Sequence, residues 1–135
     1  MKKTALVLIV IFGLVLASCG DNKREGKPKV LVFSKTMGFK HASIPVGIAA
    51  IQKLGTENGF EVDTTKNAEL FTEENLEKYS SIIFLSTTMN VLDAKQEAAF
   101  ERYIQSGGGY VGIHAAADCE YDWGWYNKLV GAQFL

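Results

Sequence analysis

Residues 107–118 have the sequence Gly-Gly-Gly-Tyr-Val-Gly-Ile-His-Ala-Ala-Ala-Asp, and this stretch decides the fold. The three glycines end a preceding helix, because glycine is a poor helix former. Residues 110–113 then predict a buried strand, which runs directly into His114 among alanines. A polar residue at the carboxyl end of an apolar strand is typical of α/β proteins that present a functional side chain there.

Three other segments, residues 29–34, 60–64 and 81–86, predict strands of the same sheet. The first and third are apolar almost throughout, as expected of strands that are covered on both faces. Helical patterns separate the four strands, at residues 43–58, 72–79 and 93–106. Strands that alternate with helices of this length predict right-handed βαβ units and a parallel sheet between two helical layers.

The expected helices carry recognisable signals. Ser43 and Thr72 are plausible N-caps, and Asp93 with Gln96 has the spacing of a capping box. In the first helix four apolar residues are expected to share the buried face: Ile44, Ile48, Ile51 and Leu54.

The first 28 residues predict a leader and a tether. An apolar run follows Lys2 and Lys3 and ends in Leu-Ala-Ser-Cys at residues 16–19, which is the pattern of a secretory signal. A cysteine directly after Leu-Ala-Ser resembles a bacterial lipobox and predicts lipidation of Cys19. A plain signal peptide or an uncleaved anchor is the alternative. We therefore expect a signal peptide at residues 1–18, a tether at 19–28 and one domain at 29–135. The expected location is the bacterial cell envelope, lipid-anchored to the membrane on its periplasmic side or at the cell surface.

Charge and cysteine content narrow the function further. Without Lys2 and Lys3, 12 of the 14 basic residues remain against 15 acidic ones, and no basic stripe suggests a nucleic-acid partner. With Cys19 lipidated, Cys119 is the one free thiol, so no intrachain disulfide is expected. No motif for a cofactor is present, and the loop at residues 35–40 lacks the glycine spacing of a phosphate-binding loop.

Both histidines of the chain follow predicted strands. His41 lies in the loop after the first strand, and His114 ends the fourth. In an open parallel sheet, ligands bind outside the carboxyl ends of the strands, so these side chains are candidates for one crevice. Asp118 follows His114 closely, so both histidines with Asp118 could form a metal site. They lack the helical spacing of a dedicated zinc motif, and we expect no metal.

The spacing around His114 resembles a nucleophile elbow, with small residues two positions before and after it, Gly112 and Ala116. Imidazole suits general acid or base chemistry near neutral pH and is a poor nucleophile for acyl transfer. His114 with Asp118 is therefore the expected catalytic pair. The alternative is a structural histidine that is buried at the strand end.

The remaining candidates are expected to contact a substrate. They are Phe39, His41, Thr87, Thr88, Tyr121 and Trp123. Carboxylates beside aromatic rings, as in the loop at residues 118–126, are typical of sugar-binding sites, although the same rings can simply pack that loop on the sheet. For the threonines the alternative is turn chemistry, and for His41 it is an ordinary exposed loop position. Cys119 is expected to be inert, because its acidic neighbours raise a thiol pKa.

Together these segments resemble the ThuA-like (trehalose utilisation) domain family. The residues that carry the resemblance are 29–45, 84–92, 107–116, 120–123, 125–126 and 128–131. The sequence departs from the usual pattern at Cys119, where a threonine is common, and at Gly124, where a proline is common. The resemblance covers residues 29–135.

The resemblance implies a flavodoxin-like three-layer α/β/α sandwich with a parallel sheet, similar to class I glutamine amidotransferases. His114 then occupies the position of the amidotransferase cysteine, which implies that glutaminase activity is absent. Domains of the family continue beyond the equivalent of Leu135, so the fold is expected to be incomplete at the C-terminus.

The residues and the resemblance together lead us to expect a lipid-anchored protein that binds or processes a small carbohydrate; the resemblance implies a role in trehalose-type or keto-sugar metabolism. Whether it is an enzyme stays open. The alternative is a non-catalytic carbohydrate-binding or interaction module.

Overall fold

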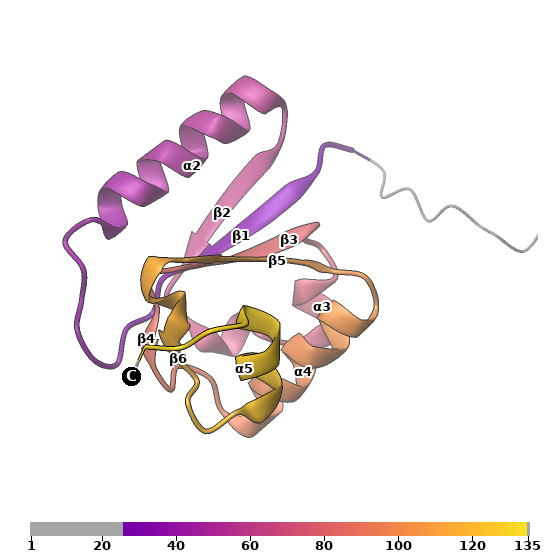
Figure 1. Ribbon diagram of the computed structural model, residues 1–135. Helices are drawn as coiled ribbons and strands as arrows, with labels where there is room; N and C mark the ends of the chain where they lie inside the picture. Colours follow the sequence, from indigo (N-terminus) through magenta and orange to yellow (C-terminus); the bar gives the residue numbers. More distant parts are fainter. Residues whose placement is uncertain (1–25, 135) are drawn as a thin grey trace, which may run out of the picture.

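The computed structural model describes residues 26–134 (Figure 1). The predicted signal peptide, the predicted lipidation site Cys19 and most of the predicted tether lie outside the described residues. Within residues 26–134, no helix combines the length and the apolar character needed to cross a membrane.

The centre of the fold is a parallel sheet of four strands. They are β1 (Lys29–Phe33), β2 (Glu61–Thr65), β3 (Ser81–Leu85) and β5 (Gly109–Ile113), in the order β2-β1-β3-β5. Each neighbouring pair is parallel, with Leu31 opposite Asp63 on one side and Ile82 on the other. The four predicted strands and their parallel arrangement are confirmed.

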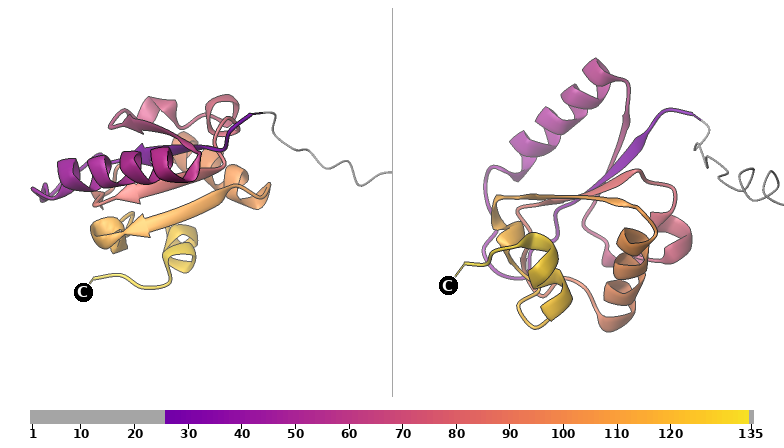
Figure 2. Two further views of the ribbon diagram at one scale, coloured as in Figure 1. Left: turned by 90° about the horizontal axis from the view of Figure 1, so that it is seen from above. Right: turned by 45° about the vertical axis from the view of Figure 1, so that its right-hand side comes forward.

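Helices cover both faces of the sheet (Figures 1 and 2). Of the helices in residues 26–134, only α2 (Ile44–Asn58) lies on one of the two faces. On the other face lie η1 (Ala68–Leu70), α3 (Glu73–Leu76), α4 (Ala94–Gln105) and α5 (Gly124–Val130). The three-layer α/β/α architecture is therefore confirmed.

Alternating strand residues divide the core into two clusters. Leu31, Phe33, Ile82 and Phe84 face the layer of four helical segments, while Val32, Ile83 and Leu85 face α2. The larger cluster is dominated by aromatic rings. Its closest pair, Phe33 and Phe71, has ring centroids 4.6 Å apart, and Phe84 packs on both Phe33 and Phe100. Rings in such contacts hold the sheet and the helices in fixed positions.

The predicted helix signals are largely confirmed. Asp93 and Gln96 form both halves of a capping box at the start of α4, and the Thr72 hydroxyl accepts a hydrogen bond from the Asn75 N–H. Ser43 occupies the N-cap of α2 but makes no side-chain capping bond. Helix α3 ends at Leu76, earlier than expected, because the chain turns so that Tyr79 can enter the core.

The expectation for Leu54 is wrong. Its side chain is 50% exposed, and Gly55 faces the sheet instead. The buried stripe begins at Ile44, continues through Ile48 and Ile51, and reaches Gly55, because the helical spacing of three and four residues places position 55, not 54, in line. A side chain at Gly55 would meet the Phe60 carbonyl oxygen at 2.7 Å, so glycine lets α2 approach β2 closely.

Candidate functional site

Three loops are joined at the carboxyl edge of the sheet. Two short strands that the sequence did not predict, β4 (Thr88–Met89) and β6 (Asp118–Cys119), pair in parallel, and Thr36 forms a bridge to Thr88. The Met37 N–H also donates to the Thr88 carbonyl oxygen at 3.0 Å. The segments that follow β1, β3 and β5 are therefore fixed side by side.

His114 stands at a sharp turn from β5 into η2 (His114–Ala117), with a φ of +54°. For a residue with a side chain, this left-handed backbone costs about 1–3 kcal/mol, and such residues often occur at functional sites. Among the described residues, Ser86, Met89 and Glu120 share this feature, and all of them follow β3 or β5. The strain of the described backbone is thus concentrated at one edge of the sheet.

The sequence places small residues beside His114, and the close contacts around Gly112 explain why. A Cβ atom at Gly112 would lie 2.7 Å from the Tyr110 hydroxyl oxygen and 3.2 Å from the Ala116 Cβ. The first distance is shorter than real Cβ contacts allow, so a larger residue at position 112 would have to displace the Tyr110 side chain, which is hydrogen-bonded to Tyr126. The backbone has the shape of a nucleophile elbow, with an imidazole in the place of the nucleophile.

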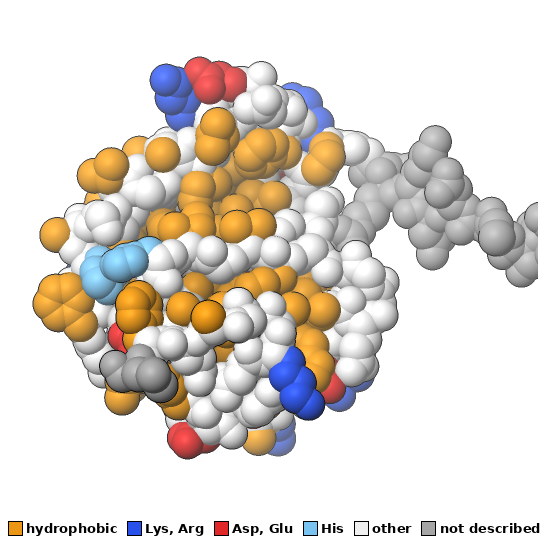
Figure 3. Space-filling view, in the orientation of Figure 1, with side chains coloured by type: hydrophobic (Ala, Val, Ile, Leu, Met, Phe, Trp, Pro, Cys, Tyr) orange, Lys and Arg blue, Asp and Glu red, His pale blue; other side chains and the backbone are white. Residues whose placement is uncertain are grey.

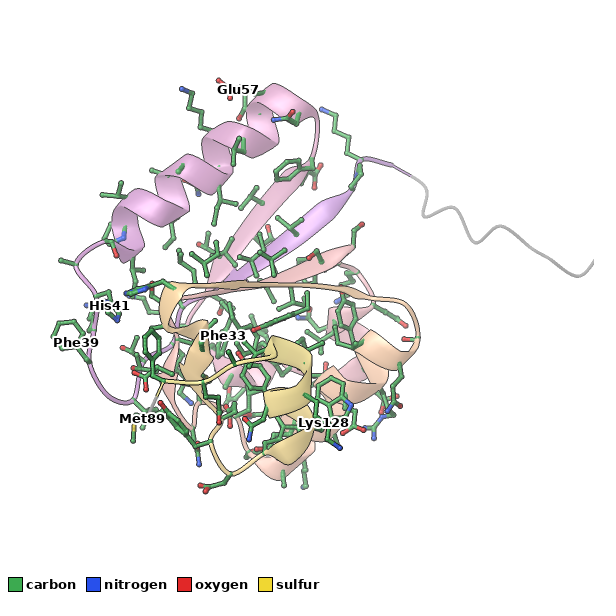
Figure 4. The ribbon with its side chains drawn as sticks, in the orientation of Figure 1. Phe33, Phe39, His41, Glu57, Met89 and Lys128 are labelled. Atoms are coloured by element: carbon green, nitrogen blue, oxygen red, sulfur yellow. The ribbon has the colours of Figure 1, made fainter. Side chains whose placement is uncertain are left out.

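The two histidines meet in one pocket, as the sequence predicts. Their ring centroids are 4.5 Å apart, and the ring of Phe39 packs edge-on against His41 at 4.9 Å. In Figure 3 the imidazoles form a single patch between hydrophobic side chains, and Figure 4 shows Phe39 and His41 on the loop between β1 and α2. His114 is exposed and His41 is half-buried, which contradicts both the buried structural histidine and the ordinary exposed loop residue.

The pocket has a volume of about 270 Å³ and is mostly apolar. Its lining consists of Phe39, His41, His114, Ala115, Asp118 and Phe134. The phenyl ring of Phe134 faces His114 with centroids 6.4 Å apart, and the Phe134 N–H donates to the Ala117 carbonyl oxygen. Within residues 26–134, no three His, Cys, Asp or Glu side chains are grouped to hold a metal ion.

Asp118 and Tyr121 form a hydrogen-bonded pair at the rim of the pocket. The Tyr121 hydroxyl donates to Asp118 Oδ1, and the Phe134 carbonyl oxygen lies 3.3 Å from the same hydroxyl. The bond to Asp118 raises the pKa of Tyr121, because it stabilises the protonated phenol. Tyr121 thus reaches the pocket through Asp118 and does not line it.

Thr87 and Thr88 lie behind the pocket wall, and both are fully buried. The Thr88 hydroxyl donates to the Phe39 carbonyl oxygen at 3.1 Å and accepts from the Gly38 N–H at 3.2 Å. It holds the loop that carries Phe39 and His41, so its hydrogen-bonding capacity is used within the protein. The structure does not bring either threonine into the pocket.

Trp123 is also outside the pocket. Its indole stacks on Trp125 at 5.1 Å and on Tyr126 at 5.8 Å between centroids, and it packs against Phe100 of the core. Trp123, Trp125 and Tyr126 therefore pack this loop on the sheet, as in the alternative that the sequence left open, whereas Tyr121 does not.

Glu120 has a role that the sequence did not reveal. It is 1% exposed, and its Oε1 atom accepts hydrogen bonds from the Val91 N–H at 2.8 Å and the Leu92 N–H at 2.9 Å. Burial raises the pKa of Glu120, while these two bonds oppose the shift. The carboxylate ties the loop after β5 to the loop after β3, and no short-range signal marks a partner almost thirty residues away.

Cys119 has the properties of an inert thiol. It is fully buried, and burial raises its pKa to about 12; the Thr87 hydroxyl offsets the shift in part, while Glu120 and Asp118 add to it. A thiol that stays protonated at neutral pH is a poor nucleophile. The expectation of an inert cysteine is confirmed.

Comparisons with known proteins agree with this architecture. The sequence model of a family described as ThuA, trehalose utilisation, matches residues 29–135. A crystal structure of a ThuA-like protein from Bacteroides uniformis ATCC 8492 is similar, with 30% sequence identity and a TM-score of 0.61. The match covers 82% of this chain and 46% of that protein, so the chain spans about half the length of this relative. A search of curated proteins found no match.

Proposed function

The chain belongs to the ThuA (trehalose utilisation) family, and from this premise we propose that the pocket at His41 and His114 binds a small carbohydrate and acts on it. The observation that carries the proposal is the contact between the two imidazoles at the carboxyl edge of the sheet, with ring centroids 4.5 Å apart. Ligands of open parallel sheets bind at this edge.

The chemistry of the pocket suits a sugar. Sugars present both apolar C–H faces and hydroxyl groups. The rings of Phe39 and Phe134 can pack on the C–H faces. His41, His114 and Asp118 offer hydrogen-bond donors and acceptors for the hydroxyl groups of the sugar. Among the described residues, Asp118 Oδ2 has no hydrogen-bond partner, which leaves it available for a ligand hydroxyl.

In the catalytic version of the proposal, His114 is the general acid or base. Its imidazole lines the pocket, and an imidazole can accept and donate protons near neutral pH. Asp118 binds a hydroxyl of the sugar, and Tyr121 positions Asp118. An elbow whose central residue is His114 has no thiolate for acyl transfer, so we propose that glutaminase activity is absent.

The cellular setting is part of the proposal. A lipid on Cys19 would attach the domain to a membrane of the bacterial envelope, where the pocket would meet sugars outside the cytoplasm. The non-catalytic alternative keeps the same pocket for binding alone.

Replacing Phe39 by alanine is expected to weaken sugar binding about tenfold, because covering one face of a phenyl ring contributes about 1.4 kcal/mol. Phe39 is 71% exposed, so the melting temperature is expected to change little. Isothermal titration calorimetry against a panel of disaccharides and their keto derivatives measures the dissociation constant.

Val46→Ala is the matched control, since Val46 on α2 is also 71% exposed but lies outside the pocket. Equal affinities of the wild-type protein and Phe39→Ala for a sugar that binds would show that the sugar lies elsewhere.

A further inference from the structure

A second hollow is built largely from the same loop that carries His41. It has a volume of about 260 Å³ and is lined by Ser34, Lys35, Thr36, Met37, Lys40 and Lys66. The first five residues follow β1, and Lys66 follows β2, so the hollow also lies at the carboxyl edge of the sheet. None of its lining residues belongs to the histidine pocket.

The hollow concentrates positive charge that carboxylates do not neutralise. Among residues 26–134, Lys35, Lys40 and Lys66 have no ion pair within 4 Å. Within the same residues, Lys29, Lys53 and Arg102 pair with carboxylates, and the remaining lysines do not. What distinguishes Lys35, Lys40 and Lys66 is that all three line one hollow. Three unpaired ammonium groups around one concave surface repel each other, and a bound anion would relieve that repulsion.

Lys35 is the fixed member of the group. Its Nζ atom donates to the Val91 carbonyl oxygen at 2.7 Å, which uses one of three N–H donors and holds the half-buried side chain in place. Burial raises the pKa of Glu120, and the Lys35 ammonium opposes part of that rise, so Lys35 has one acidic neighbour in the protein interior. Lys40 and Lys66 are exposed and have no such acidic neighbour in ion-pair contact among the described residues.

We propose that this hollow binds a phosphate group. A phosphate carries up to two negative charges and several acceptor oxygens, which match three ammonium groups and the hydroxyl-bearing Ser34 and Thr36. The hollow lies at the carboxyl ends of β1 and β2, and ligands of open parallel sheets bind outside the carboxyl ends of the strands. The group is either free phosphate or the phosphate of a phosphorylated sugar.

Calorimetric titration of the full-length protein at constant ionic strength tests the site, with inorganic phosphate and a hexose phosphate as probes and the unphosphorylated hexose as reference. Both phosphate probes are expected to bind saturably. Lys66→Gln is expected to weaken binding of each about fivefold, the upper range for one exposed charge pair. Tighter binding of the hexose phosphate than of inorganic phosphate would identify the phosphorylated sugar as the ligand, and equal affinities would identify free phosphate.

Lys53→Gln is the matched control, because Lys53 lies on α2 and pairs with Glu57 away from the hollow. Absence of saturable phosphate binding, or equal weakening by Lys53→Gln and Lys66→Gln, would overturn the proposal. The melting temperatures of both variants verify that the fold is intact. Because Lys66 does not line the histidine pocket, loss of phosphate binding in Lys66→Gln is distinguishable from failure of sugar binding.

Discussion

Replacing His114 by asparagine is expected to lower the turnover of a sugar substrate by a factor of about 10²–10⁴, the usual contribution of a general acid or base. Binding of the same sugar is expected to persist, because Phe39, His41 and Asp118 still line the pocket. Asparagine tolerates the left-handed backbone at position 114, where φ is +54°, so the fold is expected to be retained. Steady-state kinetics and calorimetric binding, measured on the same preparation, separate the two effects.

His114→Gly is a second variant with an informative stability. Glycine adopts a positive φ without cost, so it is expected to stabilise the protein by about 1 kcal/mol while lowering turnover as asparagine does. If His114→Gly is more stable than the wild-type protein but has lost turnover, the strained backbone at His114 serves function and not stability. Unchanged turnover in both variants would contradict an acid or base role for His114, and a wild-type protein that binds sugar without turnover would favour the non-catalytic module.

Replacing Glu120 by alanine is expected to destabilise the protein by about 3–4 kcal/mol, because two buried backbone N–H groups lose a charged acceptor at once. Those groups belong to Val91 and Leu92, which lie directly before the capping box of α4. The corresponding fall in melting temperature is roughly 10–20 °C for a domain of this size. Differential scanning calorimetry or thermal circular dichroism measures it.

Two comparisons control the interpretation of that result. Asp122→Ala removes an exposed carboxylate from the same loop, where it accepts one hydrogen bond from Asn90 at 2.8 Å, and is expected to cost less than about 1 kcal/mol. Glu120→Gln keeps an oxygen at the Oε1 position, so its loss of stability is expected to lie between those of Glu120→Ala and Asp122→Ala. If Glu120→Ala were no less stable than Asp122→Ala, Glu120 would not be the anchor of this loop.

The secondary structure was predictable because its signals are local. The apolar runs that became β1 and β3, the capping box at Asp93 and the glycines before β5 all act within a few residues. The parallel sheet followed from the alternation of such strands with helices. Leu54 was wrongly expected on the buried face because it is apolar and lies three residues after Ile51, whereas the buried stripe continues four residues after Ile51, at Gly55.

The site was predictable only in outline. Strand ends identified His41, His114, Phe39 and Asp118, which the structure brings into one pocket. Which way each loop side chain points depends on tertiary contacts. The burial of Thr87 and Thr88, the stacking of Trp123 on α5 and the bonds from Glu120 to distant N–H groups are such contacts. The lysine hollow was also missed, since Lys66 joins Lys35 and Lys40 only through the pairing of β2 with β1.

The central claim is that a sugar binds between His41 and His114, and the chain offers a direct probe of it. These are its only histidines, so an untagged protein has two imidazole Hε1 resonances, and both report on the pocket. In a titration followed by nuclear magnetic resonance, both signals are expected to shift saturably, with the same dissociation constant that calorimetry gives. Sugar binding that leaves both imidazole signals unmoved would contradict the claim.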